Sequence, residues 1–218
     1  MFISYAICSH NEGQYLVDLL NRLTRNISQE TTSDYEVVIL DDFSIDPTTQ
    51  MVLRFMLEKF EYVRVSFRKH EKDFSAQKNA LNKLCKGDWI MNLDADEWIP
   101  DELMFSIPQI IESNPDVDAY WLSRLNTVDG LTDEYIKKWN WRITTLDGFD
   151  KPAVMWPDFQ MRLYKNLPEI KWINKVHERL SGFKKFSTFP IHPDYAIRHF
   201  KTISRQIEQN QLYSTIGK

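Results

Sequence analysis

The sequence of 218 residues has few of the features that mark secreted or membrane-bound proteins. Its two cysteines, Cys8 and Cys85, are too few for a disulfide framework and fit a reducing compartment. Residues 1–8 have neither the basic start nor the long apolar stretch of a signal peptide. No apolar run approaches the roughly 18 residues of a membrane span. We therefore expect a cytoplasmic protein without a transmembrane segment.

The sequence also has little net charge, formally -4, so nothing in bulk attracts it to nucleic acid or a membrane. We expect no nucleic-acid partner. The charges are nevertheless segregated, because residues 88–118 contain many acids and no Lys or Arg, whereas residues 160–205 are rich in Lys and Arg. A solvated surface explains much of this pattern. An acidic and a basic segment are also what a site for a metal ion and a diphosphate requires.

Residues 87–98 contain a short apolar run that ends in three carboxylates. Residues 89–93 suit one buried strand, and Asp94, Asp96 and Glu97 follow it. If the extended geometry continues, Asp94 and Asp96 point the same way and repel each other unless a cation lies between them. Oxygen ligands on a short motif suit Mg²⁺ or Mn²⁺ with substrate phosphates. A solvated acidic turn is the alternative interpretation.

Strand and helix patterns alternate along the first hundred residues. Strands are expected at residues 2–8, 35–40, 62–67 and 89–93. The first expected helix has Leu16, Leu19, Leu20 and Leu23 on one face, and residues 26–34 are expected to form a loop after it. The second begins at Asp46-Pro47, with Val52, Phe55 and Met56 facing inward. The third covers residues 74–86. This order predicts an α/β fold, a Rossmann-like, mostly parallel central sheet with flanking helices in a single domain. Ligands bind such sheets at the carboxyl ends of the strands, where residues 9–12, 41–42 and 94–97 would meet.

The second half of the sequence has a weaker pattern. A helix over residues 103–113 contains Pro108 and is expected to be kinked or split. Further strands are expected at residues 117–124, 159–165 and 195–200, and a polar helix at residues 203–216. Residues 125–157 have little periodicity and contain three tryptophans, Trp139, Trp141 and Trp156. Such a segment is typical of a lid or binding loop, although the tryptophans would equally fill a core.

Four ordered motifs together resemble the family-2 glycosyltransferases of GT-A fold. They cover residues 7–12, 35–46, 74–81 and 87–97, and residues 162–166 and 172–178 resemble segments that follow the Asp-x-Asp motif in a subgroup. The resemblance implies that residues 1–100 form a nucleotide-sugar-binding half. Residues 101–218 would form an acceptor-side half and the C-terminal helix of the same domain. Two positions depart from the family pattern, Phe43 in place of the usual Gly and Lys78 in place of a common Arg.

The resemblance implies metal-dependent transfer of a sugar from a nucleotide diphosphate to an acceptor hydroxyl, with Mn²⁺ or Mg²⁺. Asp96 would be the direct ligand, and Asp94 would contact the metal or the ribose. His177 or His199 is a candidate for a further ligand, although a lone His is more often structural. No Ser-His-Asp or Cys-His arrangement is evident, which fits single displacement with inversion at the anomeric carbon.

The candidate donor-binding residues lie at the ends of the first, second and fourth predicted strands and in the third helix. Asp41 can accept a hydrogen bond from N3–H of uracil and would favour a UDP-sugar, although a turn residue is the simpler interpretation. Lys78 offers a point positive charge to the diphosphate. The remaining donor-site candidates are Ser9, Asn11, Glu12 and Asp94.

A carboxylate near the metal is the natural base for the acceptor hydroxyl, and Glu178 is the first candidate. Asp158 and Glu97 are the alternatives, and Glu97 would equally orient the acidic turn. The acceptor is a glycan, a lipid-linked compound or another hydroxyl compound. A nucleotidyltransferase is less favoured because residues 9–13 contain a single glycine, and a non-catalytic nucleotide-sugar-binding module needs no metal constellation.

Overall fold

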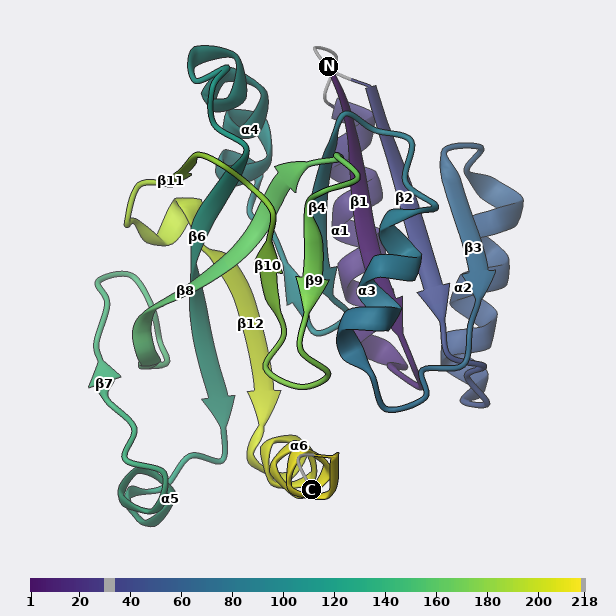
Figure 1. Ribbon diagram of the computed structural model, residues 1–218. Helices are drawn as coiled ribbons and strands as arrows, with labels where there is room; N and C mark the ends of the chain where they lie inside the picture. The colour runs from purple at the N-terminus through teal and green to yellow at the C-terminus, as the bar shows by residue number, and fades with distance from the viewer. Residues whose placement is uncertain (30–33, 217–218) are drawn as a thin grey trace.

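The computed structural model describes residues 1–29 and 34–216 and shows one mixed α/β domain around a curled sheet (Figure 1). The strand order is β3-β2-β1-β4-β8-β6-β12-β5. Its first four strands pair in parallel, and they are β1 (Phe2–Ser9), β2 (Asp34–Asp41), β3 (Val63–Phe67) and β4 (Trp89–Asp94). The predicted α/β fold with a mostly parallel central sheet is confirmed.

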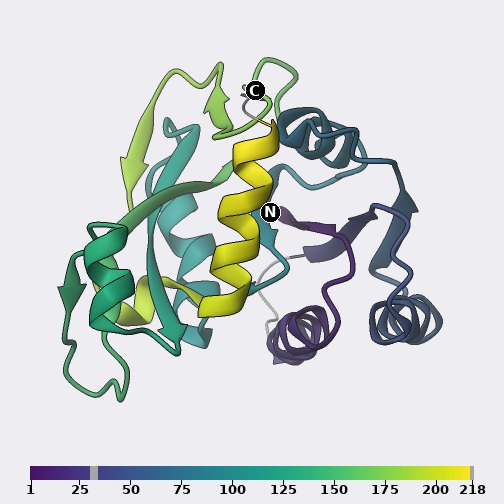
Figure 2. The ribbon, with the colours of Figure 1, turned by 90° about the horizontal axis from the view of Figure 1, so that it is seen from below.

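Three helices connect these strands, α1 (Gln14–Gln29), α2 (Pro47–Lys59) and α3 (Phe74–Asn82). Viewed from below, α1 and α2 lie on one face of the sheet and α3 on the other (Figure 2). The alternation of side chains along β1 explains this, because Ile7 packs in the cluster of α1 and α2, whereas Ala6 packs with Leu81 of α3. Apolar side chains therefore cover both faces of the parallel strands.

Three predictions for this half were wrong in detail. Helix α1 continues to Gln29 instead of ending before residue 26, and residues 30–33 of the predicted loop lie outside the described residues. Helix α3 ends at Asn82 instead of residue 86, and the Leu84 carbonyl accepts a hydrogen bond from Arg64. Phe55 is 46% exposed because α2 covers the edge of the sheet, where Leu53 takes the inward position.

The rest of the chain extends the same sheet. The helices are α4 (Asp101–Ser113), α5 (Asp133–Lys138), η1 (Pro193–Tyr195) and α6 (Ile203–Ile216). The strands are β5 (Glu97–Trp98), β6 (Ala119–Asp129), β7 (Ile143–Thr144), β8 (Ala153–Lys165), β9 (Lys171–Ile173), β10 (Arg179–Ser181), β11 (Phe186–Thr188) and β12 (Ile197–Thr202). Strand β8 runs antiparallel to both β4 and β6, and β12 runs parallel to β6.

Several predicted boundaries in this half were also wrong. Helix α4 is not split, because it runs through Pro108 with that residue buried. The segment expected to be irregular contains the end of β6, helix α5, strand β7 and the start of β8. The C-terminal helix was predicted correctly at residues 203–216.

Strand β8 contains a β-bulge at Arg162. Met161 pairs with Trp121 and Leu163 with Tyr120, so one extra residue of β8 lies between consecutive residues of β6. A bulge shifts the side-chain alternation and commonly re-aims a side chain beside an active site. Met161 and Leu163 accordingly pack in different core clusters, and Arg162 between them is buried.

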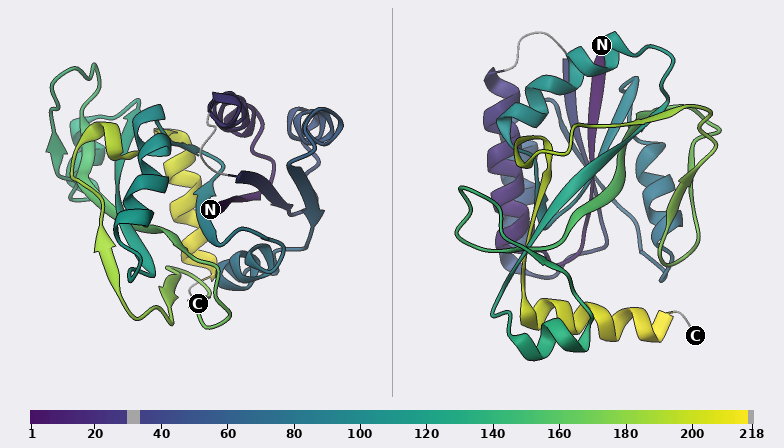
Figure 3. Two further views of the ribbon diagram at one scale, coloured as in Figure 1. Left: turned by 90° about the horizontal axis from the view of Figure 1, so that it is seen from above. Right: turned by 90° about the vertical axis from the view of Figure 1, so that its left-hand side faces the viewer.

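Helix α6 follows β12 without an intervening loop and lies across the carboxyl ends of the parallel strands (Figure 3). Helix α5 lies at the same end of the sheet, apart from α6 (Figure 1). Within residues 1–29 and 34–216, no helix is both long and apolar enough to cross a bilayer.

Candidate functional site

A cavity of about 750 Å³ opens between the carboxyl ends of β1 and β4 and helix α6. Its volume is in the range of small-molecule sites in proteins. Eight residues predicted from the sequence line it, namely Ser9, Glu12, Lys78, Asp94, Asp96, Asp158, Glu178 and His199. They come from the strand ends, from α3 and from the loop between β9 and β10, so the topology gathers them from across the whole sequence.

Three predicted residues do not line this cavity. The Asn11 amide oxygen accepts hydrogen bonds from the backbone N–H groups of Ile45 and Asp46. The buried Asp41 carboxylate accepts from the backbone N–H and the hydroxyl of Ser44 (2.7 and 2.6 Å) and borders a smaller cavity of about 340 Å³. His177 is exposed outside the main cavity. The residue after Asp41, Asp42, lines the main cavity instead.

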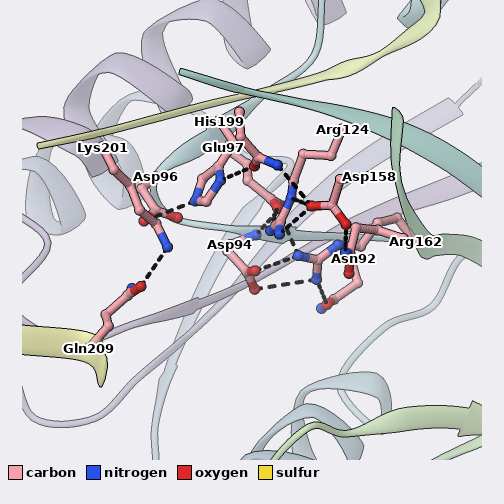
Figure 4. Close-up of polar contacts among 12 residues, drawn as sticks. Asn92, Asp94, Asp96, Glu97, Arg124, Asp158, Arg162, His199, Lys201 and Gln209 are labelled. Atoms are coloured by element: carbon pink, nitrogen blue, oxygen red, sulfur yellow. Dashed lines mark hydrogen bonds and ion pairs between the residues drawn. The ribbon is translucent and has the colours of Figure 1, made fainter. Parts of the chain in front are cut away.

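Asp94 ends β4, and two cations of the fold hold its carboxylate. Arg162 of β8 donates to it from both terminal nitrogens (Figure 4). The Lys78 ammonium lies 3.7 Å away. Burial alone would raise the pKa of the Asp94 carboxyl, but the charges of Arg162 and Lys78 outweigh it and keep the pKa well below its usual value. The Lys78 ammonium also pairs with Glu178 at 2.7 Å.

Glu97 joins the two arginines of the site. Its side chain is fully buried, and one oxygen accepts from both Arg124 (2.9 Å) and Arg162 (2.8 Å). The other oxygen accepts the backbone N–H of Asp94 at 3.0 Å. Residues 95–96 form a turn, so the extended geometry expected from the sequence ends at Asp94. Glu97 therefore stabilises this turn through its hydrogen bond from the Asp94 backbone N–H.

Asp96 has different partners, from the last strand and helix of the chain. His199 Nε2 lies 3.5 Å and Arg205 Nε 3.3 Å from Asp96 Oδ2. Strand β5 pairs with β12 in a register that sets His199 opposite Glu97, which brings the imidazole to the acidic turn. Burial by itself would raise the pKa of the Asp96 carboxyl, but His199 and Lys201 lower it on balance.

The tautomer of His199 follows from Asn126. The Asn126 amide nitrogen donates to the Val154 carbonyl and to Asp158 Oδ2, so its oxygen faces His199 Nδ1 at 2.6 Å. Nδ1 therefore carries a proton, and Nε2, which has a free lone pair when the imidazole is neutral, is the nitrogen that faces Asp96. Burial lowers the pKa of His199, which favours this neutral form.

These atoms fit a divalent cation that takes most of its ligands from a substrate. Two buried acceptors, a carboxylate oxygen of Asp96 and the Nε2 lone pair of His199, face each other and repel unless a cation or a proton lies between them. No three metal-ligating side chains are clustered in the part of the chain that the structure describes. Mg²⁺ and Mn²⁺ at nucleotide sites commonly take few protein ligands and several phosphate and water oxygens.

Asp158 lies on β8 and also lines the cavity. Its Oδ2 accepts from Arg124 (2.9 and 2.7 Å) and Asn126 (3.0 Å), and its Oδ1 accepts from Gln160 (2.8 Å). Burial would raise the pKa of Asp158, but Arg124 and these hydrogen bonds lower it on balance. The carboxylate is therefore ionised at neutral pH.

Four residues of the site were not identified as candidates from the sequence: Arg124, Asn126, Arg162 and Arg205. Arg162 stands within the recognised segment 162–166, and the basic charge of residues 160–205 included Arg205. Arg124 and Asn126 had no local signal, because their role depends on how β6 pairs with β8.

The comparisons with known proteins agree with this geometry. Residues 4–207 match the family model described as Glycosyl transferase family 2. The chain belongs to glycosyl transferase family 2. The predicted family and enzyme class, a glycosyltransferase, are thus confirmed.

Two curated relatives and one solved structure illustrate the family membership. An uncharacterized glycosyltransferase of Mycoplasma pneumoniae, named MG060 homolog, is 31% identical over 114 residues, which are 51% of this chain and 37% of the relative. The poly(ribitol-phosphate) beta-N-acetylglucosaminyltransferase TarS of Staphylococcus aureus is 25% identical over 114 residues, 52% of this chain and 19% of TarS. The chain thus spans well under half the length of these relatives.

The crystal structure of TarS residues 1–349 with UDP-GlcNAc superimposes with a TM-score of 0.63 at 19% identity. The match covers 93% of this chain and 58% of that one. This likeness confirms the GT-A fold.

Proposed function

We propose that this family-2 domain transfers a sugar from a UDP-sugar to an acceptor hydroxyl, with inversion and with a divalent metal ion. The observation that carries the proposal is the buried pair of Asp96 and His199, facing each other in a cavity that the cationic Lys78 also lines. UDP as the nucleotide is supported by the structural neighbour TarS, which binds UDP-GlcNAc.

Asp96 and His199 would hold the metal ion, with Asp94 close by. When bound, a divalent ion at this position neutralises the leaving diphosphate. Lys78 adds a permanent positive charge on the donor side, and Glu12 anchors Arg205 of α6 at the same rim. Asp94, held by Arg162, presents its exposed oxygen edge to the nucleotide-binding side.

We propose Asp158, rather than Glu178, as the base for the acceptor hydroxyl. Glu178 pairs with Lys78 at 2.7 Å, and this ion pair gives it a structural role. Asp158 is ionised, lines the same cavity as Lys78, and is held by Arg124 and Asn126 of β6. A base must reach the hydroxyl from the side opposite the leaving group, which is the role proposed for Asp158.

The test of the function measures release of the nucleoside diphosphate, UDP from UDP-glucose, UDP-galactose and UDP-GlcNAc and GDP from GDP-mannose, with and without Mn²⁺. We expect release from at least one UDP-sugar that EDTA abolishes and Mn²⁺ restores. Pyrophosphate release from UTP and a sugar 1-phosphate would indicate a nucleotidyltransferase. Binding of UDP-sugars without release, with all acceptors supplied, would indicate a binding module.

The test of the base compares Asp158→Asn with Glu178→Gln. General-base catalysis contributes about 10²- to 10⁴-fold, so we expect a kcat loss in that range for Asp158→Asn with UDP affinity kept. Glu178→Gln breaks the pair with Lys78 and should mainly raise KM for the donor. The reverse pattern would assign the base to Glu178.

The test of nucleotide recognition compares Asp41→Ala with Asp42→Ala by calorimetry with UDP and GDP. Asp41 carries the sequence-based expectation of uracil recognition, whereas Asp42 lines the main cavity. Loss of UDP preference in Asp41→Ala alone supports the expectation. Loss in Asp42→Ala alone moves recognition to Asp42.

A further inference from the structure

Two of the tryptophans are placed differently from the others. Five pack in or against the hydrophobic clusters, and these are Trp89, Trp98, Trp121, Trp156 and Trp172. Trp139 and Trp141 belong to none of the clusters found among residues 1–29 and 34–216, and both are half-buried. Core filling therefore explains five tryptophans and leaves these two without that explanation.

The two tryptophans form a ladder of rings with Tyr135. The rings of Tyr135 and Trp139 are stacked with centroids 5.0 Å apart, and those of Trp139 and Trp141 lie 4.7 Å apart. Asn140 between them has φ of 51°, a left-handed conformation that is uncommon for a residue with a side chain. This conformation sets the two flanking rings against each other, and Trp141 at the inner end of the ladder lines the main cavity.

The position of Trp141 is fixed relative to Asp158. The next residue, Arg142, exchanges hydrogen bonds with Met155, from Met155 N–H to the Arg142 carbonyl (2.8 Å) and from Arg142 N–H to the Met155 sulfur (3.3 Å). Strand β7 then pairs with β8 at Ile143 and Val154. The same strand β8 carries Asp158, so the ring and the carboxylate are held by one element.

The surroundings of Trp141 combine an aromatic face with polar side chains. Asn126, Thr127 and Asp158 line the same side of the cavity. A pyranose has apolar C–H faces and a rim of hydroxyl groups, which match an aromatic face flanked by amide and carboxylate groups. An acyclic polyol lacks such a face, and a lipid chain would leave these polar groups without partners.

We propose that Trp141, backed by Trp139 and Tyr135, is the acceptor platform and stacks a pyranose ring of the acceptor, which is therefore a carbohydrate. This inference rests on the proposed glycosyl transfer, because it places the ring next to Asp158. A pyranose stacked on Trp141 has its hydroxyl rim on the side of the cavity that Asp158 lines.

The direct test is binding without a donor. Proton–nitrogen spectra of the full chain resolve the indole N–H groups, and the Trp141 signal is assigned by its loss in Trp141→Phe. The probes are the methyl β-glycosides of glucose, galactose and N-acetylglucosamine, with ribitol 5-phosphate as an acyclic control. We expect the Trp141 signal to shift at millimolar concentrations of at least one glycoside and not with ribitol 5-phosphate.

Variants separate the platform from a structural role. Trp141→Ala should weaken binding of that glycoside about tenfold or more, while Trp141→Phe keeps most of it because a ring remains. Phe186→Ala removes an exposed aromatic ring on β11 and should leave binding unchanged. Unfolding midpoints of all three variants report whether each is folded.

The proposal is overturned if no glycoside shifts the Trp141 signal, if ribitol 5-phosphate shifts it equally, or if folded Trp141→Ala binds as the wild type does. This experiment requires no turnover. Failure of UDP release with intact glycoside binding would refute the proposed function alone. UDP release to water without glycoside binding would refute the platform alone.

Discussion

Asp94 and Asp96 stand two positions apart, yet the fold treats their charges differently. Asp94 is held by Arg162 and Lys78, whose side chains are only 4% and 7% exposed and belong to β8 and α3. Asp96 faces His199, whose pKa is lowered by burial, and Arg205 from the partly exposed helix α6. The charge of Asp94 is thus balanced within the fold, whereas that of Asp96 is, in the proposed function, available to a cation that arrives with the substrate.

The largest expected effect is on the free energy of unfolding and concerns Arg162, the buried partner of Asp94. Arg162→Met leaves Asp94 and the buried Glu97 without a shared cation, and breaking such a buried pair costs about 3–5 kcal/mol. We expect a loss of that size in the free energy of unfolding, measured by urea denaturation. The matched control is Arg54→Met, whose exposed pair with Glu58 on α2 should not move the midpoint. An unchanged midpoint for Arg162→Met would contradict this balance of charge within the fold.

The next effect concerns catalysis. Asp96→Asn should lower kcat for UDP release about 10²- to 10³-fold, because the transition-state charge loses a preorganised electrostatic partner. The unfolding midpoint should stay close to that of the wild type. Asp116→Asn removes an exposed carboxylate elsewhere and serves as the control. Turnover near the wild-type value in saturating Mn²⁺ would remove Asp96 from the metal site.

A smaller effect, on metal affinity, is expected for Asn126, which contacts His199. Asn126→Ala removes the acceptor that fixes the His199 tautomer, and losing such an outer partner typically weakens metal affinity about 10- to 100-fold. The Mn²⁺ concentration for half-maximal UDP release measures it. Asn210→Ala, on the exposed face of α6, is the control. Equal Mn²⁺ requirements for both variants would show that Asn126 does not set the tautomer.

The smallest effect concerns Arg205, the partner of Asp96 on helix α6. Arg205→Ala should lower the free energy of unfolding by less than about 1 kcal/mol, since its pairs with Glu12 and Asp96 lie near the surface. The same change should increase the apparent Mn²⁺ affinity, because it removes a competing cation from Asp96. If Arg205→Ala destabilised the fold as much as Arg162→Met, the contrast between the two carboxylates would be lost.

The sequence predicted the half of the fold whose pattern is local. Strands β1, β2 and β4 are buried on both faces and appear as continuous apolar runs, so their positions were predicted to within a residue or two. The first half of β8 was missed because Asp158 and its neighbours face the cavity, which removes the apolar alternation. The short hairpin of β9 and β10 is too brief to give a periodic signal.

The site was predictable to a similar degree and for the same reason. Asp94 and Asp96 follow a recognisable strand, so their place at the rim followed from local pattern. Arg124 and Asn126 reach the site only because β6 pairs with β8, and strand order cannot be read from a window of sequence. The role of Asp41 was expected from its place at the end of β2, yet its neighbour Asp42 is the one that lines the main cavity.

The bulge at Arg162 makes the length of β8 as constrained as its composition. Deleting one residue between Asp158 and Arg162 would restore a regular pleat but would turn one end of the strand to the opposite face of the sheet. Arg162 would then leave Asp94, or Asp158 would leave the cavity, although no side chain had been substituted. Strand β8 should therefore tolerate substitutions far more readily than insertions or deletions of single residues. Residues 145–152, which connect β7 to β8, should by contrast accept changes in length.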